Sequence, residues 1–306
     1  MELHSEQSDA GKRLDHFLHE RMPEYSRSRL QAWINAGRVQ VNGKPAKRSY
    51  LLKGGEQIQV APADLAPLGA VPEDLPLDVL YQDDDVIAIN KPAGMVVHAG
   101  AGRHSGTLVN AVLHRFGTLS GVGDPLRPGI VHRLDRLTSG VLLIARNDAA
   151  HRDLARQFSS REVEKVYLAL VHGRLKADRG RITTPITRDP LRRLRMTAKL
   201  ARGRSAITEH HVLKRFEKFT FIEVKIATGR THQIRVHMAS VGHPVVGDKL
   251  YGAPSNTLGR YFLHAHRISF SGPTSGERII ITAPLPAELQ HYLEGLDPAQ
   301  APRGQL

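Results

Sequence analysis

The 306-residue chain contains no cysteine. This absence excludes disulfides, thiolate nucleophiles and cysteine-ligated zinc or iron–sulfur sites, and it fits a reducing compartment. No run approaches the roughly 18 consecutive apolar residues of a membrane-spanning helix, and residues 1–13 lack the apolar core of a signal peptide. We therefore expect a soluble, cytoplasmic protein with no membrane partner.

Acidic residues are outnumbered as well. Asp and Glu total 30 against 43 Lys and Arg, which gives a net charge of +13 with histidine neutral. A protein this basic usually binds an anionic partner, most often nucleic acid, although surplus charge can also serve solubility alone. The length predicts about two domains, and a hydrophobic fraction of 41% suffices for a core.

Residues 12–60 predict a small α+β module. Apolar residues follow helical spacing over residues 14–22, and a second short helix would be capped by Ser26 and ended by Gly37. Short strands follow, with a strong hairpin signal at Asn42-Gly43. This order of elements resembles an S4 RNA-binding domain; the alternative is an unrelated module with solvated charges. On the S4 interpretation, RNA would contact the basic residues Arg27, Arg29, Arg38, Lys44, Lys47 and Arg48.

A linker is expected after this module. Residues 61–78 contain four prolines, four acidic residues and neither Lys nor Arg. This composition predicts an extended segment whose negative charge keeps it away from RNA. We divide the chain into an S4-like domain (1–62), the linker (63–78), a larger domain (79–295) and a C-terminal tail (296–306).

The larger domain mixes strands and helices without regular alternation. Strand patterns cover residues 79–81, 86–89, 141–145, 166–171 and 220–226. This arrangement predicts an α+β fold with a largely antiparallel sheet rather than a doubly wound fold.

Three helices are expected between these strands. One covers residues 107–116 with Thr107 as its N-cap, a second is capped by Asp148, and a third covers residues 231–240. The start of the third helix is basic, and its free N–H groups suit a phosphate.

One short segment holds the main candidate for catalysis. Within His132–Gly140, a single carboxylate, Asp135, lies between Arg133 and Arg136 and precedes an apolar strand. Nearby arginines favour the ionised carboxylate, which can act as a nucleophile or a general base. A structural salt bridge is the alternative for an isolated sequence of this kind.

Three further segments combine special residues with a strand or turn. KPAGMVVH begins at Lys91, EKVYLALV places Lys165 and Tyr167 on one face of a strand, and TGRTHQIRVHM begins at Thr228. Each segment alone has an ordinary structural explanation. In this order, with HRLDRLTSG between the first two, they resemble the RluA family of RNA pseudouridine synthases over residues 79 to about 290.

The resemblance is specific. HRLD, rather than GRLD, is typical of the RluA branch, and the S4-like module and residues 242–252 are similar to the RluD and RluC type, which modifies large-subunit ribosomal RNA. The resemblance implies that Asp135 is the catalytic aspartate and that Arg230 pairs with it. It implies that Arg133 enters the RNA stack in place of the flipped base, and that Tyr167 stacks on the uracil and assists removal of its C5 proton.

Further expectations concern substrate and chemistry. Lys91, His132 and Thr138 are expected to bind substrate, and the protein is expected to act as a monomer on structured RNA. Isomerising uridine to pseudouridine involves no net redox change or second substrate, so no cofactor is expected. Flipping the uridine costs a few kcal/mol, and stacking can offset part of this cost. Asp135 acts through either a ribose glycal, which the resemblance favours, or a C6 adduct.

Three alternatives remain open at this point. The chain has 17 histidines, and the pairs His264/His266 and His232/His237 could suggest a metal hydrolase, but they lack carboxylates at a recognisable ligand spacing. We therefore expect no metal site. A non-catalytic S4-type RNA-binding protein and a tRNA pseudouridine synthase are the other two.

Overall fold

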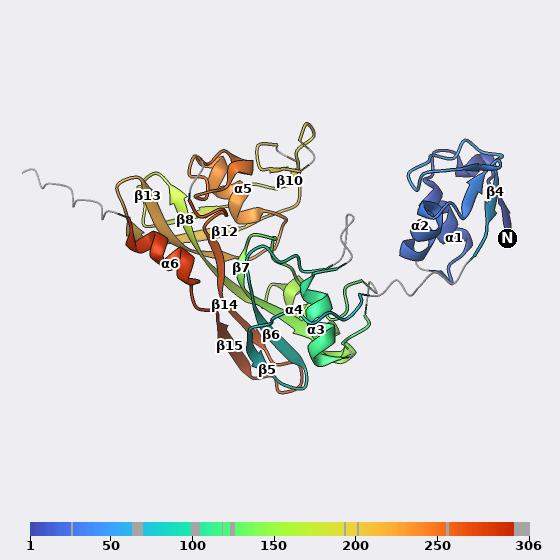
Figure 1. The fold of residues 1–306 in the computed structure, drawn as a ribbon. Helices are drawn as coiled ribbons and strands as arrows, with labels where there is room; N and C mark the ends of the chain where they lie inside the picture. The colour runs from blue at the N-terminus through green and yellow to red at the C-terminus, as the bar shows by residue number, and fades with distance from the viewer. Residues whose placement is uncertain are drawn as a thin grey trace, which may run out of the picture. The chain divides into compact units, whose positions relative to one another are not determined.

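The computed structural model describes residues 1–25, 27–62, 70–98, 105–117, 119–122, 126–192, 194–200, 202–254 and 257–296. The chain forms two compact units, Met1–Gly69 and Ala70–Leu306. Figure 1 shows the elements of each unit, and each is described by itself.

The N-terminal unit packs two helices on an antiparallel sheet. Its strands lie in the order β1 (Glu2–His4), β4 (Gln57–Val60), β2 (Val39–Val41) and β3 (Lys44–Pro45). The helices are α1 (Leu14–Arg21) and α2 (Arg27–Asn35), with a single turn, η1 (Gln7–Asp9), before them. Apolar side chains of both helices and of β2 and β4 form one core around Trp33.

Local sequence explains the turns of this unit. Asn42 and Gly43 have φ angles of 49° and 74°, so both adopt the left-handed conformation that a tight two-residue hairpin requires between β2 and β3. Gly37 ends α2 with a φ of 71°. Ser26, the expected N-cap, lies outside the described residues.

The second unit is built on a nine-stranded sheet. Its strands lie in the order β5 (Val79–Gln82), β6 (Val86–Lys91), β7 (Ser139–Ala145), β14 (Leu263–Ser271), β8 (Glu164–His172), β13 (Phe219–Ile226), β12 (Thr208–Arg215) and β9 (Arg179–Ile182), with β15 (Arg278–Thr282) paired to β14. Every pair in this sheet is antiparallel except β7–β14. The predicted α+β class with a largely antiparallel sheet is confirmed.

Helices lie on both faces of this sheet. Alternating residues of β13 separate the faces: Ile222 and Val224 join the main core, whereas Phe219 and Phe221 pack toward α6 (Ala287–Glu294). The main core also receives side chains from α3 (Leu108–Phe116), α4 (Asp148–Ser160) and α5 (Gln233–Ser240). These three helices are therefore on the face opposite α6.

The helix caps follow from short polar side chains. Thr107 caps α3 as predicted, because its hydroxyl accepts a hydrogen bond from the Asn110 backbone. The predicted cap of α4 was wrong by one residue: Asn147, not Asp148, accepts from the Ala150 N–H. Asp148 is instead the first helical residue, where its charge suits the helix dipole.

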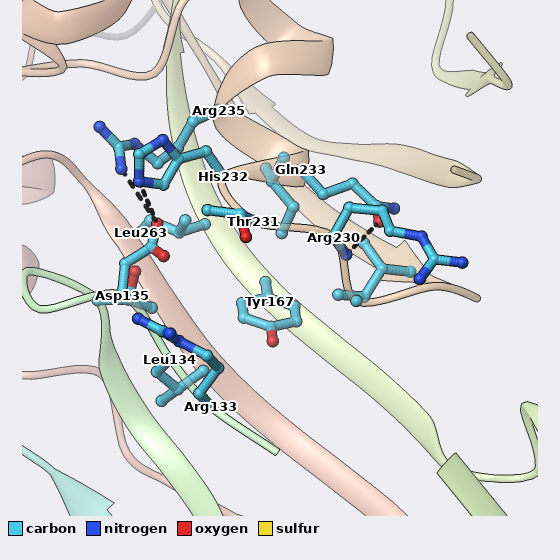
Figure 2. Close-up of a pocket in the computed structure, with 14 residues that line it drawn as sticks. Arg133, Leu134, Asp135, Tyr167, Arg230, Thr231, His232, Gln233, Arg235 and Leu263 are labelled. Atoms are coloured by element: carbon cyan, nitrogen blue, oxygen red, sulfur yellow. Dashed lines mark hydrogen bonds and ion pairs between the residues drawn. The ribbon is translucent and has the colours of Figure 1, made fainter. Parts of the chain in front are cut away.

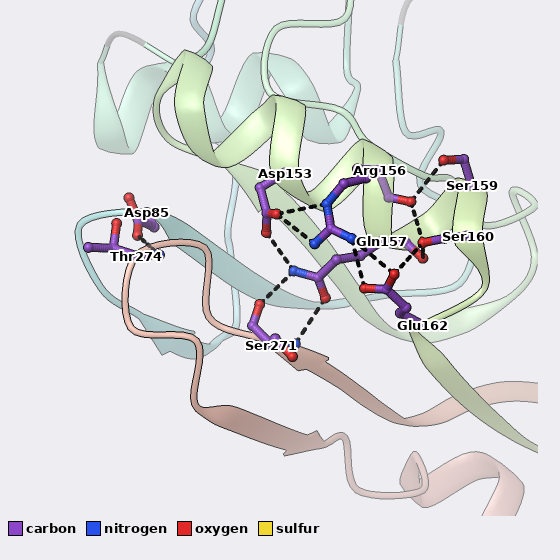
Figure 3. A network of polar contacts seen from close by, with 9 residues as sticks. All are labelled: Asp85, Asp153, Arg156, Gln157, Ser159, Ser160, Glu162, Ser271 and Thr274. Atoms are coloured by element: carbon purple, nitrogen blue, oxygen red, sulfur yellow. Dashed lines mark hydrogen bonds and ion pairs between the residues drawn. The ribbon is translucent and has the colours of Figure 1, made fainter.

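A buried glutamine fixes α4 to the end of β14. The Gln157 amide donates to the Ser271 carbonyl at 2.7 Å and accepts from the Ser271 N–H at 2.9 Å, while Asp153 holds the same amide at 2.6 Å (Figure 3). Nearby, Asp85 accepts from the Thr274 N–H in the loop between β14 and β15. The Gln157 contacts hold α4 against the end of β14 in the central sheet.

Residues 70–78 lie within the second unit, although we predicted them as part of the linker. Glu73 accepts from the Gly106 N–H, its own N–H donates to the Asn110 carbonyl, and the Asn110 amide donates to the Val71 carbonyl. Leu77 packs against the main core. The start of α3 therefore anchors this segment.

In the part of the chain that the structure describes, no helix is long and apolar enough to cross a membrane.

Candidate active site

The loop that carries Asp135 enters the sheet where β7 meets β14. Upstream of the loop, the chain runs along the edge of β7: the Ala145 N–H donates to Gly129 O at 2.8 Å, and the Leu143 N–H donates to His132 Nε2 at 2.8 Å. The loop then closes on itself, because the Thr138 N–H donates to the Asp135 carbonyl at 3.1 Å. Asp135 is thus presented by a loop supported on both sides.

His132 supports this loop instead of facing a substrate, which corrects its expected role. Its Nε2 accepts a backbone hydrogen bond, so the ring is neutral with its proton on Nδ1. The ring stacks on Phe158 with centroids 4.6 Å apart. Burial, with the charge of Lys165, lowers the pKa of His132 to about 3.

Lys91 is likewise internal, and its predicted contact with substrate was wrong. Its ammonium is fully buried and donates to the carbonyls of Pro92, Met95 and Arg136 at 2.8, 3.1 and 3.3 Å. Burial and the charge of Arg260 lower the pKa of Lys91 to about 7, while Asp135 acts in the opposite sense. The lysine therefore joins the KPAG turn to the Asp135 loop.

Asp135 forms its ion pair with Arg235, not with Arg230 as we predicted. Arg235 Nη1 lies 3.0 Å from Asp135 Oδ2, with His232 Nε2 at 3.8 Å and the Tyr261 hydroxyl at 3.5 Å from the same oxygen. Figure 2 shows Arg235 and His232 directed toward Asp135, whereas Arg230 lies beyond Tyr167. Arg235 takes the place expected for Arg230 beside Asp135, because α5 directs the Arg235 side chain toward the carboxylate.

A second carboxylate fixes Arg235. Asp248, which is buried, accepts from Arg235 Nε at 2.6 Å and from Nη2 at 2.9 Å. The guanidinium also lies 4.2 Å from the centroid of the Tyr261 ring. Burial disfavours its charge, but hydrogen bonds and the nearby acids outweigh this and raise the pKa of Arg235 above its ordinary value.

Arg230 belongs to a group of cations at the edge of the pocket. Its Nε donates to the Ser205 carbonyl at 3.0 Å, and its backbone N–H is bound by the Gln233 side chain. Burial, together with the charges of Arg204 and Arg161, lowers the pKa of Arg230. Such a concentration of positive charge suits a polyanion.

Arg133, Tyr167 and Thr138 line the same pocket as Asp135. Arg133 is exposed, and within the described ranges no acidic partner is recorded for it. The Tyr167 ring is buried in β8; burial and the charge of Asp135 raise the pKa of its phenol. Thr138 is buried with its hydroxyl 3.2 Å from that of Tyr261. Arg136 donates to the Gly94 carbonyl instead, so among the described residues neither arginine that flanks Asp135 in sequence is recorded as its ion-pair partner.

The basic residues expected to bind RNA in the N-terminal unit differ in their exposure and contacts. Arg27 donates two hydrogen bonds to the buried Asp15, at 2.8 and 3.1 Å, and its side chain is still 41% exposed. Arg29 is half-buried, and the remaining candidates are exposed: Arg38, Lys44, Lys47 and Arg48.

The histidines considered as metal ligands form hydrogen bonds within the protein. His264 contacts the Ser139 hydroxyl and the Ala283 carbonyl, and His266 contacts the same carbonyl. His237 lies between Thr208 and the Thr184 carbonyl. Over the described residues, no group of three or more His, Asp or Glu side chains could hold a metal ion.

Sequence reasoning missed four residues of this site: His232, Arg235, Asp248 and Tyr261. A usable signal existed for one of them. In the sequence Arg235 stands between the apolar residues Ile234 and Val236, and a charged residue buried among apolar neighbours requires a partner. His232, Asp248 and Tyr261 had no such signal, because only folding brings them to the loop.

Comparisons with known proteins identify the family of the chain. A family model described as RNA pseudouridylate synthase matches residues 85–240, and an S4 domain model matches residues 12–58. The structure resembles human RNA Pseudouridylate Synthase Domain Containing 1 with a TM-score of 0.58 and 27% identity, covering 74% of this chain and 98% of that one.

Several bacterial relatives match nearly the whole chain. The Ribosomal large subunit pseudouridine synthase D of Xanthomonas campestris is 44% identical, covering 98% of this chain and 93% of its own. The protein of the same name from Neisseria meningitidis is 44% identical, with 94% and 79% covered. An RNA pseudouridine synthase of Aquifex aeolicus is 45% identical, with 88% and 89% covered. The chain therefore belongs to the RNA pseudouridylate synthase family and is an RNA pseudouridine synthase, an isomerase with an S4 domain.

Proposed function

We propose that this enzyme converts uridines of large-subunit ribosomal RNA to pseudouridine, with Asp135 as the catalytic carboxylate acting on a uridine that has left the helical stack. The observation that carries the proposal is the Asp135 side chain in the pocket, 3.0 Å from the buried Arg235. The choice of RNA is supported by the relatives named Ribosomal large subunit pseudouridine synthase D, at 44% identity. With this substrate we expect the enzyme to act in the cytoplasm.

The contacts of Asp135 suit a reactive carboxylate. All three polar groups near its side chain, from Arg235, His232 and Tyr261, approach Oδ2. Among the described residues, no hydrogen bond to Oδ1 is recorded. Oδ2 is thus held in place, and Oδ1 is available to attack the nucleotide or to remove a ribose proton.

Tyr167 and Arg133 are placed to receive a flipped nucleotide. Because the pKa of Tyr167 is raised, its phenol is neutral near pH 7 and suits stacking on the uracil better than proton abstraction. Arg133 is exposed on the Asp135 loop, so it can enter the space that the uridine leaves. Their contacts would offset part of the few kcal/mol that flipping costs.

Phosphate contacts would come from the cations around the pocket and on the N-terminal unit. Arg230 lies close enough to Arg204 and Arg161 for their charges to lower its pKa. Arg38, Lys44, Lys47 and Arg48 are exposed on the other unit. Affinity for RNA should fall with added salt, because each phosphate contact releases counterions.

Replacing the carboxylate tests the catalytic assignment. Asp135→Asn keeps the shape of the side chain but removes its charge, so pseudouridine formation should be abolished while RNA binding remains. The matched control is Asp178→Asn, at an exposed surface ion pair with Arg215, which should leave both unchanged. Full activity of Asp135→Asn would refute the assignment.

Mapping pseudouridines tests the substrate. Total RNA from cells with and without the gene should differ at one or more uridines of large-subunit ribosomal RNA. A difference confined to tRNA would overturn the ribosomal proposal and favour a tRNA pseudouridine synthase.

A further inference from the structure

His232 lies beside Asp135 in a rare backbone conformation. It directly precedes α5 with a φ of 56°, in the left-handed region that residues other than glycine seldom adopt. Its imidazole lines the pocket, with Nε2 3.8 Å from Asp135 Oδ2 and Nδ1 2.8 Å from the Tyr251 hydroxyl. The ring therefore connects the carboxylate with a tyrosine in η2 (Lys249–Tyr251).

The hydrogen bonds of Tyr251 favour one tautomer of His232. The Met196 N–H can only donate, and it donates to the Tyr251 hydroxyl oxygen at 3.0 Å. A phenol has one proton, and the one acceptor recorded for it within the described part of the chain is His232 Nδ1. With the phenol donating to Nδ1, a neutral ring carries its proton on Nε2, which faces Asp135.

The surroundings keep this ring neutral. Burial lowers the pKa of His232; Asp135 and Asp248 oppose this shift, whereas Arg235 and Arg133 add to it. Tyr251 stays protonated near neutral pH, because burial raises its pKa to about 12. Near pH 7 the imidazole is thus a neutral donor toward the carboxylate.

We propose that His232 is a positioning residue for Asp135, and that the hydrogen bonds from the Met196 N–H through Tyr251 set the tautomer in which His232 turns its Nε2–H toward Oδ2, 3.8 Å away. With Arg235 and Tyr261 on the same oxygen, this contact directs Oδ1 toward the nucleotide. The opposite tautomer would turn the Nε2 lone pair toward the carboxylate and repel it. The inference rests on the proposed catalytic role of Asp135.

The hydrogen-bond series from Met196 to His232 begins in a short hairpin. Met196 starts β11 (Met196–Thr197), which pairs with β10 (Thr187–Arg188) as a hairpin in an arginine-rich segment. The Arg195 guanidinium lies 5.2 Å from the centroid of the Tyr251 ring. The turn end of this hairpin therefore contacts the same tyrosine that orients His232, so its position affects the carboxylate.

Nitrogen-15 spectra of histidine-labelled protein read the tautomer directly and need no activity. The resonances of His232 are identified by their loss in His232→Gln. We expect a neutral ring protonated on Nε2 in the wild type, and a mixed population in Tyr251→Phe, which keeps the ring but loses the hydroxyl. A wild-type ring protonated on Nδ1, or spectra that Tyr251→Phe leaves unchanged, would refute the proposal.

A double-mutant cycle tests the effect on catalysis. Tyr251→Phe should lower kcat about tenfold in the wild type but less than about twofold in His232→Gln, because the hydroxyl acts through the imidazole. KM for RNA should change little in either background. The matched controls Tyr292→Phe and His291→Gln, both on α6, should leave kcat unchanged.

Two outcomes of the cycle would overturn the proposal: equal effects of Tyr251→Phe in both backgrounds, or a rise in KM alone. These outcomes are distinct from failure of the proposed function. If Asp135→Asn is active, the proposed catalytic role of Asp135 is wrong. If Asp135→Asn is inactive but Tyr251→Phe lowers kcat equally in the wild type and in His232→Gln, only the proposed role of His232 is wrong.

Discussion

At the scale of single residues, Arg235 shows how the site holds a charge inside the fold. Its guanidinium is 6% exposed as a side chain and contacts two carboxylates, Asp135 at 3.0 Å and Asp248 at 2.6 Å. The buried Asp248 accepts two hydrogen bonds from the arginine, whereas Asp135 also lines the pocket. One acid therefore fixes the arginine, and the arginine fixes the acid proposed to react.

The first prediction concerns this buried pair. Asp248→Asn should lower the free energy of unfolding by about 3 kcal/mol, because removing one partner leaves a buried charge incompletely paired. Urea denaturation measures the change. Glu164→Gln, at a surface pair 3.1 Å from Lys225, serves as control and should cost less than about 1 kcal/mol. Similar costs for the two variants would contradict the prediction.

Asp15 predicts a pH dependence for the N-terminal unit. Burial opposes its charge, but hydrogen bonds from Arg13, Arg27 and Gln31 prevail and hold its pKa far below the ordinary 3.8. A carboxyl whose pKa is lowered by folding stabilises the folded state above pH 3.8, and this contribution is lost as the pH falls through and below that value. Acid should therefore destabilise this unit.

The sole tryptophan, Trp33, lies in the core of the same unit, so its fluorescence follows unfolding there. Asp15→Asn should lower the free energy of unfolding by about 2–3 kcal/mol at pH 6, with the difference shrinking below pH 4. Glu20→Gln, which affects an exposed pair with Lys12, is the control and should change little. A difference independent of pH would argue against the paired carboxylate as its source.

At the scale of elements, the junction of β7 and β14 depends on a glycine. Gly140 pairs with Ala265 in the one parallel contact of the described sheet and has a φ of 112°. A β-carbon there would overlap the Ala265 carbonyl oxygen. The strands can approach only because this position has no side chain, and that approach places the Asp135 loop beside Tyr261.

Gly140→Ala should therefore cost at least about 3 kcal/mol of stability or prevent folding, because both the conformation and the space exclude a methyl group. Soluble yield and the urea midpoint measure the effect. Gly121→Ala is the matched control: a β-carbon at Gly121 meets no atom within 4 Å. A Gly140→Ala protein as stable as the control would show that the junction can relax.

At the scale of the whole molecule, the two units have separate cores. The core around Trp33 draws only on residues of the N-terminal unit, and the core around β6, β7 and β8 draws only on the second. Hydrogen bonds from Glu73 and Asn110 tie the start of the second unit to its own α3. Each unit therefore contains the contacts that would stabilise it alone.

Deleting residues 1–62 should leave the second unit folded but weaken its binding to structured ribosomal RNA. The lost phosphate contacts should also reduce the dependence of affinity on salt, by about 0.7–0.9 in log–log slope for each contact. Filter binding over a salt series measures both. The matched variant replaces Arg38, Lys44, Lys47 and Arg48 with glutamine in the full chain and should reproduce much of the loss. Insoluble protein after the deletion would contradict independent folding.

The sequence by itself determined the fold class, the family and many of the helices and strands, but not β9, β10, β11 or β12. These depend on local patterns: a continuous apolar run marks β8, alternation marks β13, helical spacing marks α1 and α3, and Asn42-Gly43 marks a turn. The four motifs lie within or next to such elements, so their place along the chain could be read before the fold was known.

Only the tertiary structure decided which charges meet. Arg230 and Arg235 share one motif and are equally plausible partners for an aspartate 95 or 100 residues away, but the orientation of α5 turns only Arg235 toward Asp135. Packing likewise assigned Lys91 to backbone carbonyls and Arg27 to Asp15. Long polar side chains can reach many partners, and the choice among them depends on burial and geometry that no local pattern contains.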